Sequence, residues 1–259
     1  MKILFIGDIV GKPGRLAVKE LLPVLIHDYG LDFVIGNAEN AAGGSGITER
    51  VAKELFDSGV NVLTSGDHIW KKSEIFEILT REDRILRPIN YPEGAPGSGA
   101  AIFKTGKGLS IGVINVLGRV FMEALESPFK TLLAARESLA AKTKIIIVDI
   151  HAEATSEKVA IGWLLDGKVS AILGTHTHIQ TADEKILPLG TAYITDVGMT
   201  GPFTSVIGRR IEDVLERFMT SIPVRFEVAE GDIQLHGAIV DIDENTGRAN
   251  SIVRIQKKL

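Results

Sequence analysis

The chain has 259 residues and carries 29 Lys and Arg against 33 Asp and Glu, a formal net charge of −4. It has six His and no Cys. The lack of Cys excludes disulfide scaffolds, Cys-ligated zinc, iron–sulfur clusters and thiol nucleophiles. The slight acidic excess argues against an extended nucleic-acid surface, which needs a clear excess of positive charge. The 45% hydrophobic fraction is typical of a globular protein with a large core.

Short β-branched runs alternate with amphipathic stretches along most of the chain. Strands are predicted at residues 2–6, 33–35, 60–64, 111–116, 144–150, 171–173 and 192–195. Helices are predicted at residues 14–29, 48–58, 73–79 and 129–141. This alternation indicates a largely parallel sheet whose faces are covered by helices.

The last part of the chain has a different pattern. Residues 224–228, 233–243 and 251–255 alternate apolar and polar side chains and are separated by turn sequences. We therefore expect antiparallel strands there that form or extend a second sheet. No internal repeat or low-complexity tract divides the chain, so we predict one domain over residues 1–259, with two packed sheets and helices outside.

No segment has the length and apolar character of a membrane span or a secretory signal. The apolar start at residues 1–6 stops at Gly7-Asp8, which is too short for a signal peptide. A cytoplasmic protein without membrane contact is the resulting expectation.

Five of the predicted strands are followed at once by polar side chains of the metal-binding type. These are Asp8, Glu39-Asn40, Asp67-His68, His151 and His176-x-His178. Because the carboxyl ends of parallel strands meet at one edge of a sheet, these groups should converge.

Each of these residues also has an ordinary structural interpretation. Asp8 could cap a helix, Glu39-Asn40 could be loop polarity, and a single strand-end His is often structural. Four of the six His together with three acids at one edge are harder to explain in this way, and the His-x-His pair favours a cation. We expect His27 and His236, in a helix pattern and a strand pattern, to be structural.

The ligand types indicate the kind of ion. Carboxylate, imidazole and amide without sulfur suit manganese, iron or zinc. Seven candidate ligands exceed the needs of one tetrahedral ion and fit two ions that share a carboxylate.

The segment Gly7-Asp-Ile-Val-Gly11-Lys12-Pro13-Gly14 offers a rival interpretation, because it follows a strand and precedes a helix as phosphate-binding loops do. Its spacing is one residue short of the P-loop pattern, and Pro13 stands where Ser or Thr is required. We interpret its glycines as turn residues and Pro13 as a helix-entry residue.

The polar residues that follow the five strands, from Asp8 to His178, together resemble the ordered motifs of the calcineurin-like metallophosphoesterases. They resemble more closely those of the YmdB-like branch of bacterial phosphodiesterases. The resemblance covers nearly the whole chain. It is carried by the order of the strand-end residues and by Gly-Asn-Ala-Glu-Asn (36–40), Ser-Gly-Asp-His-Ile-Trp (65–70) and Thr-Asp-Val-Gly-Met-Thr-Gly-Pro (195–202).

The resemblance implies a four-layer α/β/β/α sandwich of two mixed sheets flanked by helices, with a dinuclear centre, commonly iron or manganese. It places Asp8, Glu39, Asn40 and His178 on one ion and Glu39, Asp67, His151 and His176 on the other, with Glu39 bridging. It implies hydrolysis of phosphodiesters, characteristically 2′,3′-cyclic nucleotides, by a metal-bridging hydroxide with His68 as proton donor. Homo-oligomers are common in this branch, so we expect one here.

Two departures from the wider superfamily matter. The first block of the superfamily is Asp-x-His, whereas this chain reads Asp8-Ile9-Val10 and lacks that imidazole, so Asn40 would supply an oxygen instead. The third block has Asp67 in place of the usual Asn, which adds a charge and removes an amide donor.

Three assignments remain open on the sequence alone. Asp149 could orient an imidazole or be a buried strand residue with another role. Gly198, Met199 and Thr200 could contact the substrate or form a tight turn with Met199 in the core. The same centre could serve a phosphomonoesterase or a non-catalytic regulatory metal protein.

Overall fold

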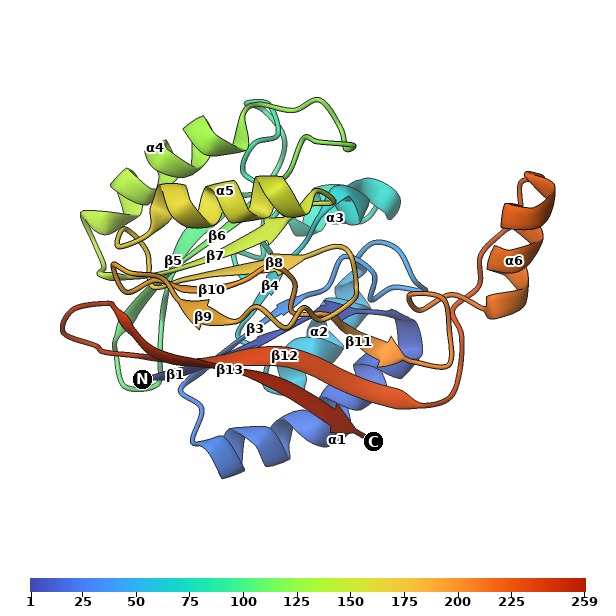
Figure 1. Ribbon diagram of the computed structural model, residues 1–259, viewed down its shortest axis with the longest axis horizontal. Helices are drawn as coiled ribbons and strands as arrows, with labels where there is room; N and C mark the ends of the chain where they lie inside the picture. Colours follow the sequence, from blue (N-terminus) through green and yellow to red (C-terminus); the bar gives the residue numbers. More distant parts are fainter.

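The computed structural model describes residues 1–259 and arranges most of them in four layers, with two sheets stacked face to face and helices outside (Figure 1). The predicted architecture is therefore confirmed. The first sheet contains β1 (Lys2–Ile6), β2 (Asp8–Ile9), β3 (Phe33–Asn37), β4 (Val62–Thr64), β11 (Met199–Pro202), β12 (Ile233–Ile242) and β13 (Ala249–Lys258). The second contains β5 (Ala100–Lys104), β6 (Ser110–Leu117), β7 (Ile145–His151), β8 (Ala171–Thr175), β9 (Lys185–Ile186) and β10 (Ala192–Ile194).

The helices are distributed over both outer faces. Helices α1 and α2 cover the first sheet, and α4 and α5 cover the second (Figure 1). Their bounds are α1 (Gly11–Tyr29), α2 (Glu49–Asp57), α3 (Ile75–Ile78), α4 (Pro128–Ala140), α5 (Thr155–Leu165) and α6 (Ile211–Thr220), with a 3-10 turn η1 (Asp67–Lys71). None of them combines the length and apolar character that a membrane span requires.

The period of two in the strands explains the layering. In β1, Ile3 and Phe5 face the second sheet, whereas Leu4 packs on the helical side. In β7, Ile147 faces the first sheet and Ile146 faces α4 and α5. Both faces of these strands are buried, which is why Ile3–Ile6 of β1 and Ile145–Val148 of β7 are apolar without interruption.

The parallel cores of the two sheets are β1–β3–β4 and β6–β7–β8–β10. The C-terminal strands do not join the second sheet, contrary to the prediction. Instead β12 pairs antiparallel with β1, in the register Ile3↔Val240, and β13 pairs with β12. The apolar alternation of these strands specifies a half-buried face but not the sheet that covers it.

Several elements differ from the prediction. Residues 224–228 form no strand, because no neighbouring strand lies alongside them. Within this segment Val228 makes an isolated bridge to Arg209. The edge strand β5 and the helices α5 and α6 were not predicted. In α5 the apolar side chains are spread around much of the helix, which hides the periodic stripe, and α6 projects away from the body (Figure 1).

Candidate metal centre

The polar strand ends of both sheets meet at one place, so the convergent edge is built from two sheets rather than one. From the first sheet come Asp8 in β2, Glu39 and Asn40 after β3, and Asp67 and His68 at the start of η1 after β4. From the second come His151 at the end of β7, and His176 and His178 after β8. The stacking of the sheets is therefore what brings the imidazoles to the carboxylates.

Four of these side chains form a compact cluster that could hold a cation. One atom each of Glu39, Asp67, His151 and His176 lies within 4.8 Å of the others. His151 Nε2 is 3.2 Å from Glu39 Oε2, 3.4 Å from Asp67 Oδ1 and 3.0 Å from His176 Nδ1. Carboxylate oxygens and imidazole nitrogens at this spacing suit a first-row transition metal.

Asp8, Asn40 and His178 form a second group on the other side of Glu39. His178 Nε2 lies 3.8 Å from Asp8 Oδ1 and 3.2 Å from Asn40 Nδ2. The amide of Asn40 also contacts Glu39 Oε1, at 2.9 Å. The two oxygens of Glu39 thus face different groups, which is the arrangement required of a carboxylate that bridges two ions.

The chemistry of the site fits metal ions. Asp8 Oδ1 and Asp67 Oδ1 are buried oxygens without a hydrogen-bond partner, and such oxygens are costly unless a cation or proton meets them. Gly66 leaves room for the cluster, because a Cβ atom there would overlap His151 Nε2 and Glu39 Oε2. Asn40 directs its amide nitrogen toward Glu39 and His178 and its oxygen toward His68, so a half-turn of the amide that brings the oxygen to that group gives up the contact with His68.

The ionisation of the cluster follows from burial and mutual attraction. Burial raises the pKa of Glu39, but nearby His151 and His68 outweigh burial and hold that pKa well below its usual value. Burial lowers the pKa of His151, but Glu39 and Asp67 raise it well above its usual value. Burial and the neighbouring His151 lower the pKa of His176 to about 4, so His176 is neutral.

A hydrogen-bond relay sets the orientation of His151. Its Nδ1 donates to Thr175 Oγ1 at 2.8 Å, and that hydroxyl donates to Asp149 Oδ1 at 2.7 Å. Asn37 Nδ2 donates to the other oxygen of Asp149 at 3.0 Å. In the neutral imidazole this relay places the proton on Nδ1, so Nε2 is the atom that would offer a lone pair to a metal ion once His151 gives up its second proton.

The relay settles the role of Asp149 and brings Thr175 and Asn37 into the surroundings of the cluster. Asp149 does orient an imidazole, but through Thr175 rather than by direct contact. Burial raises the pKa of Asp149 to about 6, against the opposing effect of His151. Thr175 and Asn37 were not predicted as site residues. Both are polar residues at the last position of a strand, and this position could have identified them.

The His-x-His segment is held in an unusual backbone conformation. His176 has φ +96° and His178 has φ +64°, a region that non-glycine residues rarely adopt and that costs about 1–3 kcal/mol each. Nδ1 of His178 donates to the carbonyl of Ile207 at 2.9 Å, and His176 Nε2 lies 3.3 Å from Glu153. These contacts direct His178 Nε2 and His176 Nδ1 inward.

His68 has its own place at the rim. Its Nδ1 donates to Asn40 Oδ1 at 2.8 Å, its side chain is 29% exposed, and its Nε2 lies 3.7 Å from Asp67 Oδ2. Hydrogen bonding to Glu39 raises the pKa of His68 despite partial burial.

Gly198, Met199 and Thr200 lie in and beside β11, where Met199 pairs with Asp8 in parallel register. Met199 and Thr200 are buried, and Thr200 Oγ1 donates to the carbonyl of His236. In this structure the segment positions Asp8, and contact with a substrate stays a prediction.

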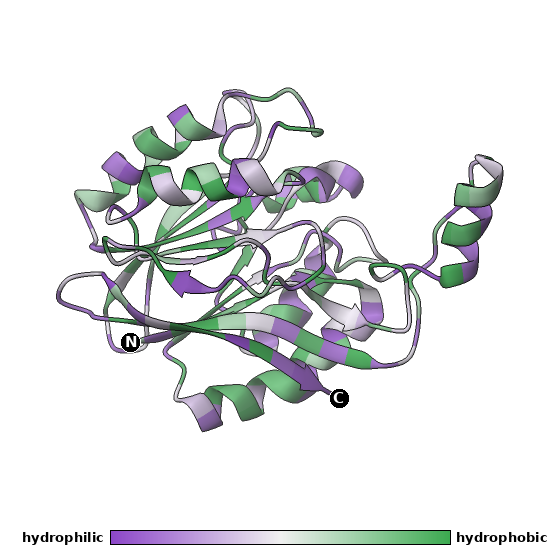
Figure 2. Cartoon of the chain, viewed as in Figure 1, coloured by the Kyte–Doolittle hydropathy of each residue, from purple (hydrophilic) through white to green (hydrophobic).

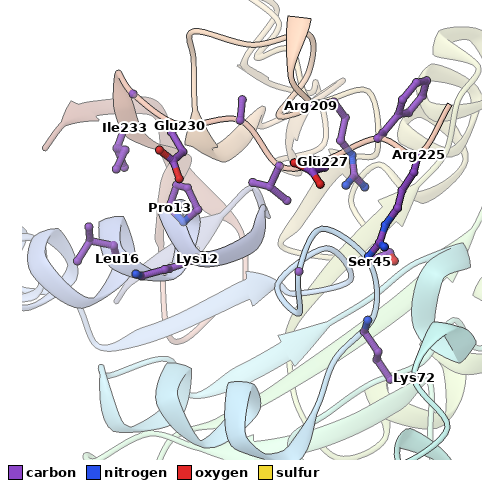
Figure 3. A pocket seen from close by; sticks show the side chains of 15 residues that line it. Lys12, Pro13, Leu16, Ser45, Lys72, Arg209, Arg225, Glu227, Glu230 and Ile233 are labelled. Carbon is purple, nitrogen blue, oxygen red and sulfur yellow. The ribbon is translucent and has the colours of Figure 1, made fainter. Parts of the chain in front are cut away.

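A cavity of about 890 Å³ is lined in part by Gly43 and Ser45 of the loop that follows Asn40 (Figure 3). Arg209 contacts the carbonyl of Gly44 in this loop, whose amide donates to Asn40. The charged side chains that line the cavity are Lys12, Lys72, Arg209 and Arg225 against Glu227 and Glu230. The lining therefore has an excess of positive charge on an acidic protein.

Two stacked mixed sheets flanked by helices, with carboxylates and imidazoles at their joined edge, define the class that the resemblance indicated, the metallophosphoesterases. The model of the YmdB-like protein family matches residues 4–255, and the chain belongs to this family.

Relatives match over almost their full length. The chain is 50% identical to the 2′,3′-cyclic-nucleotide 2′-phosphodiesterase of Bacillus subtilis, over 98% of this chain and 96% of the relative. Its fold is similar to a crystal structure of a hypothetical protein from Thermus thermophilus (TM-score 0.94, 41% identity, 100% and 99% of the two chains). It is also similar to the crystal structure of a novel phosphatase from Mycoplasma pneumoniae (TM-score 0.92, 36% identity, 100% and 93%).

Proposed function

We propose that residues 1–259 act as a single metallophosphoesterase domain that hydrolyses small phosphodiesters, with 2′,3′-cyclic nucleotides as the characteristic substrates. The observation that carries the proposal is the position of Glu39 between two groups of ligand-type side chains, with His68 at their open rim. The activity named for the Bacillus subtilis relative supports the same substrate class.

Two metal ions are part of this proposal, iron or manganese in the first place and zinc as the alternative. Glu39, Asp67, His151 and His176 would hold one ion, and Glu39 would share the other with the group described above, Asp8, Asn40 and His178. When bound, the ions would supply positive charge against the phosphoryl oxygens and lower the pKa of water to about 7.

The protein contributes position and protons. Thr175 and Asp149 keep the Nε2 lone pair of His151 directed inward. His68 Nδ1 donates a hydrogen bond to Asn40 Oδ1 in the structure. With the Asn40 oxygen turned toward an ion, Glu39 Oε1, which lies 3.3 Å from the same nitrogen, would hold the ring instead. His68 is then placed to protonate a departing sugar oxygen, a role typical of general acids.

A substrate panel on the metal-reconstituted protein tests the proposal. We expect hydrolysis of 2′,3′-cyclic AMP and of bis(p-nitrophenyl) phosphate, with much slower turnover of p-nitrophenyl phosphate. Faster turnover of the monoester would identify a phosphomonoesterase at the same centre. Bound metal without hydrolysis of any ester would identify a non-catalytic metal protein.

Two further predictions belong to the proposed function. We expect the protein in the cytoplasm, acting on a small nucleotide rather than on long nucleic acid or a membrane, and as a homo-oligomer. Cell fractionation and the solution mass of the purified protein test them.

A further inference from the structure

The loop after Asn40 offers free hydrogen-bond donors to the basic cavity. We call residues 43–46, Gly-Gly-Ser-Gly, the glycine loop. Gly43 and Ser45 of this loop line the cavity, and their amides and the Ser45 hydroxyl donate to no group within the chain. Neighbouring backbone amides that are left free in a loop are a common way to bind an anion.

The basic side chains of the cavity have no partners of opposite charge. None of the four forms an ion pair with a carboxylate; they are Lys12, Lys72, Arg209 and Arg225. Of the two acids in the lining, Glu227 is paired with Arg210 at 3.3 Å, which leaves Glu230 as the one unpaired acid. Four unpaired cations in one cavity of a chain with net charge −4 indicate a ligand that carries negative charge.

Arg209 joins this positive lining to the glycine loop. Its guanidinium donates to the carbonyl of Gly44, and a Cβ atom at Gly44 would overlap this guanidinium. Burial lowers the pKa of Arg209, and the attraction of Glu39 opposes this effect. Because a guanidinium stays charged in proteins, a half-buried positive charge lines the cavity with a backbone oxygen as its partner.

Two further cations approach the same loop. A Cβ atom at Gly46 would overlap the side chain of Lys72, so glycine is what allows this lysine to lie against the loop. Figure 3 shows the side chains of Arg225 and Lys72 directed toward Ser45. Together with Arg209 they surround the free donors of the glycine loop.

The rest of the lining can receive the organic part of a ligand. Its apolar side chains include Leu16, Val228 and Ile233. Figure 2 shows hydrophobic and hydrophilic bands alternating along α1, whose first turns supply both Leu16 and Lys12 to the cavity. The volume of about 890 Å³ lies within the range of about 300–1,000 Å³ that is typical of small-ligand sites.

We propose that this cavity binds a small phosphomonoester, whose phosphate meets the glycine loop together with Arg209, Arg225 and Lys72. A phosphate dianion offers several acceptor oxygens and two charges, which arginine forks and loop amides match. The chain as a whole is acidic, which favours a small ligand over long nucleic acid. No residue of the lining belongs to the two groups of ligand-type side chains, so the site does not depend on the proposed function.

Calorimetric titration of adenosine 5′-monophosphate into the full chain tests the proposal, with metal removed by chelation so that no ion can hold the phosphate. Adenosine, which lacks phosphate, and 2′,3′-cyclic AMP, which carries a single charge, should each bind at least about 10-fold more weakly. The double variant Lys72→Gln/Arg225→Gln should weaken the binding of adenosine 5′-monophosphate by about 100-fold, because two charge-assisted contacts are lost.

Lys19→Gln/Lys71→Gln is the matched control. It removes the same amount of positive charge at two exposed positions outside the lining, and it should bind adenosine 5′-monophosphate as the wild type does. Thermal unfolding equal to that of the wild type would show that the cavity variant folds.

Three results would overturn the proposal. Binding that appears only after manganese is restored would place the phosphate at the metal centre. Adenosine that binds as tightly as its monophosphate would make the cavity an apolar site. Equal weakening in the cavity variant and in the control variant would reduce the effect to the net charge of the chain.

Discussion

The hydroxyl oxygen of Thr175 lies 2.8 Å from Nδ1 of His151 and 2.7 Å from a carboxylate oxygen of Asp149. A threonine therefore transmits the influence of a buried acid to an imidazole that faces the candidate metal centre. Because the hydroxyl can accept from one partner only while donating to the other, the relay selects one tautomer of His151.

Replacing Thr175 with Val should weaken metal binding by about 10- to 100-fold, as is typical when the group that orients a ligand is lost. The shape of the side chain is kept, so the fold should persist. Metal titration followed by calorimetry measures the effect, and Thr175→Ser should retain near-normal affinity because it keeps the hydroxyl. Equal affinities for the Val and Ser variants would show that the relay is only structural.

His68→Ala should lower kcat on bis(p-nitrophenyl) phosphate by about 10²–10⁴, the usual contribution of a general acid. Its metal content should be unchanged, because His68 belongs to neither group of ligand-type side chains and its partly exposed ring stands at the rim. His27→Ala, at an exposed position on α1, is the control and should behave as the wild type. Loss of metal from the His68 variant would make this residue a ligand and contradict its role as proton donor.

Asp67→Asn should weaken metal binding by roughly 10-fold, since it removes one negative charge from a ligand 3.4 Å from His151. At saturating metal the rate should be restored or raised, because the new amide can donate to a phosphoryl oxygen. Elemental analysis and rates measured over a series of manganese concentrations separate the two effects. If affinity and rate were both unchanged, this interpretation of Asp67 would be wrong.

His236 predicts a dependence of stability on pH. Burial lowers its pKa to about 4, and its Nδ1 has no hydrogen-bond partner. The unfolded chain, with an ordinary value near 6.5, takes up this proton first. The contribution of the neutral His236 to the free energy of unfolding is therefore fully present above pH 6.5 and is lost as the pH falls toward 4. We expect a loss of about 2 kcal/mol after allowing for solvent screening.

Denaturant unfolding of His236→Gln between pH 7 and 4 measures this contribution. The variant should lose less stability than the wild type over that interval, because it has no group to protonate there. His27→Gln, at a side chain that is 90% exposed, should follow the wild-type curve. Parallel curves for the wild type and the His236 variant would contradict the assignment.

The sequence by itself determined which chemistry the chain carries. Apolar runs that end in Asp8, Glu39 or His151 identify strand ends, and ligand-type residues at strand ends indicate a shared edge. This inference depends only on local periodicity and on a general property of parallel strands. The same local information located most of the strands and the helices α1 to α4 before any contact was known.

Only the tertiary structure decided how these parts meet. Thr175 is 24 residues from His151 in sequence, and Asn37 is 112 residues from Asp149, so no local pattern could pair them. Whether β12 joins one sheet or the other depends on which face covers its apolar side, and a period of two is the same in both cases. Helix α6 shows the same limit: the spacing of Ile211, Leu215 and Phe218 gives an apolar stripe, but that these side chains are exposed follows from three-dimensional packing alone.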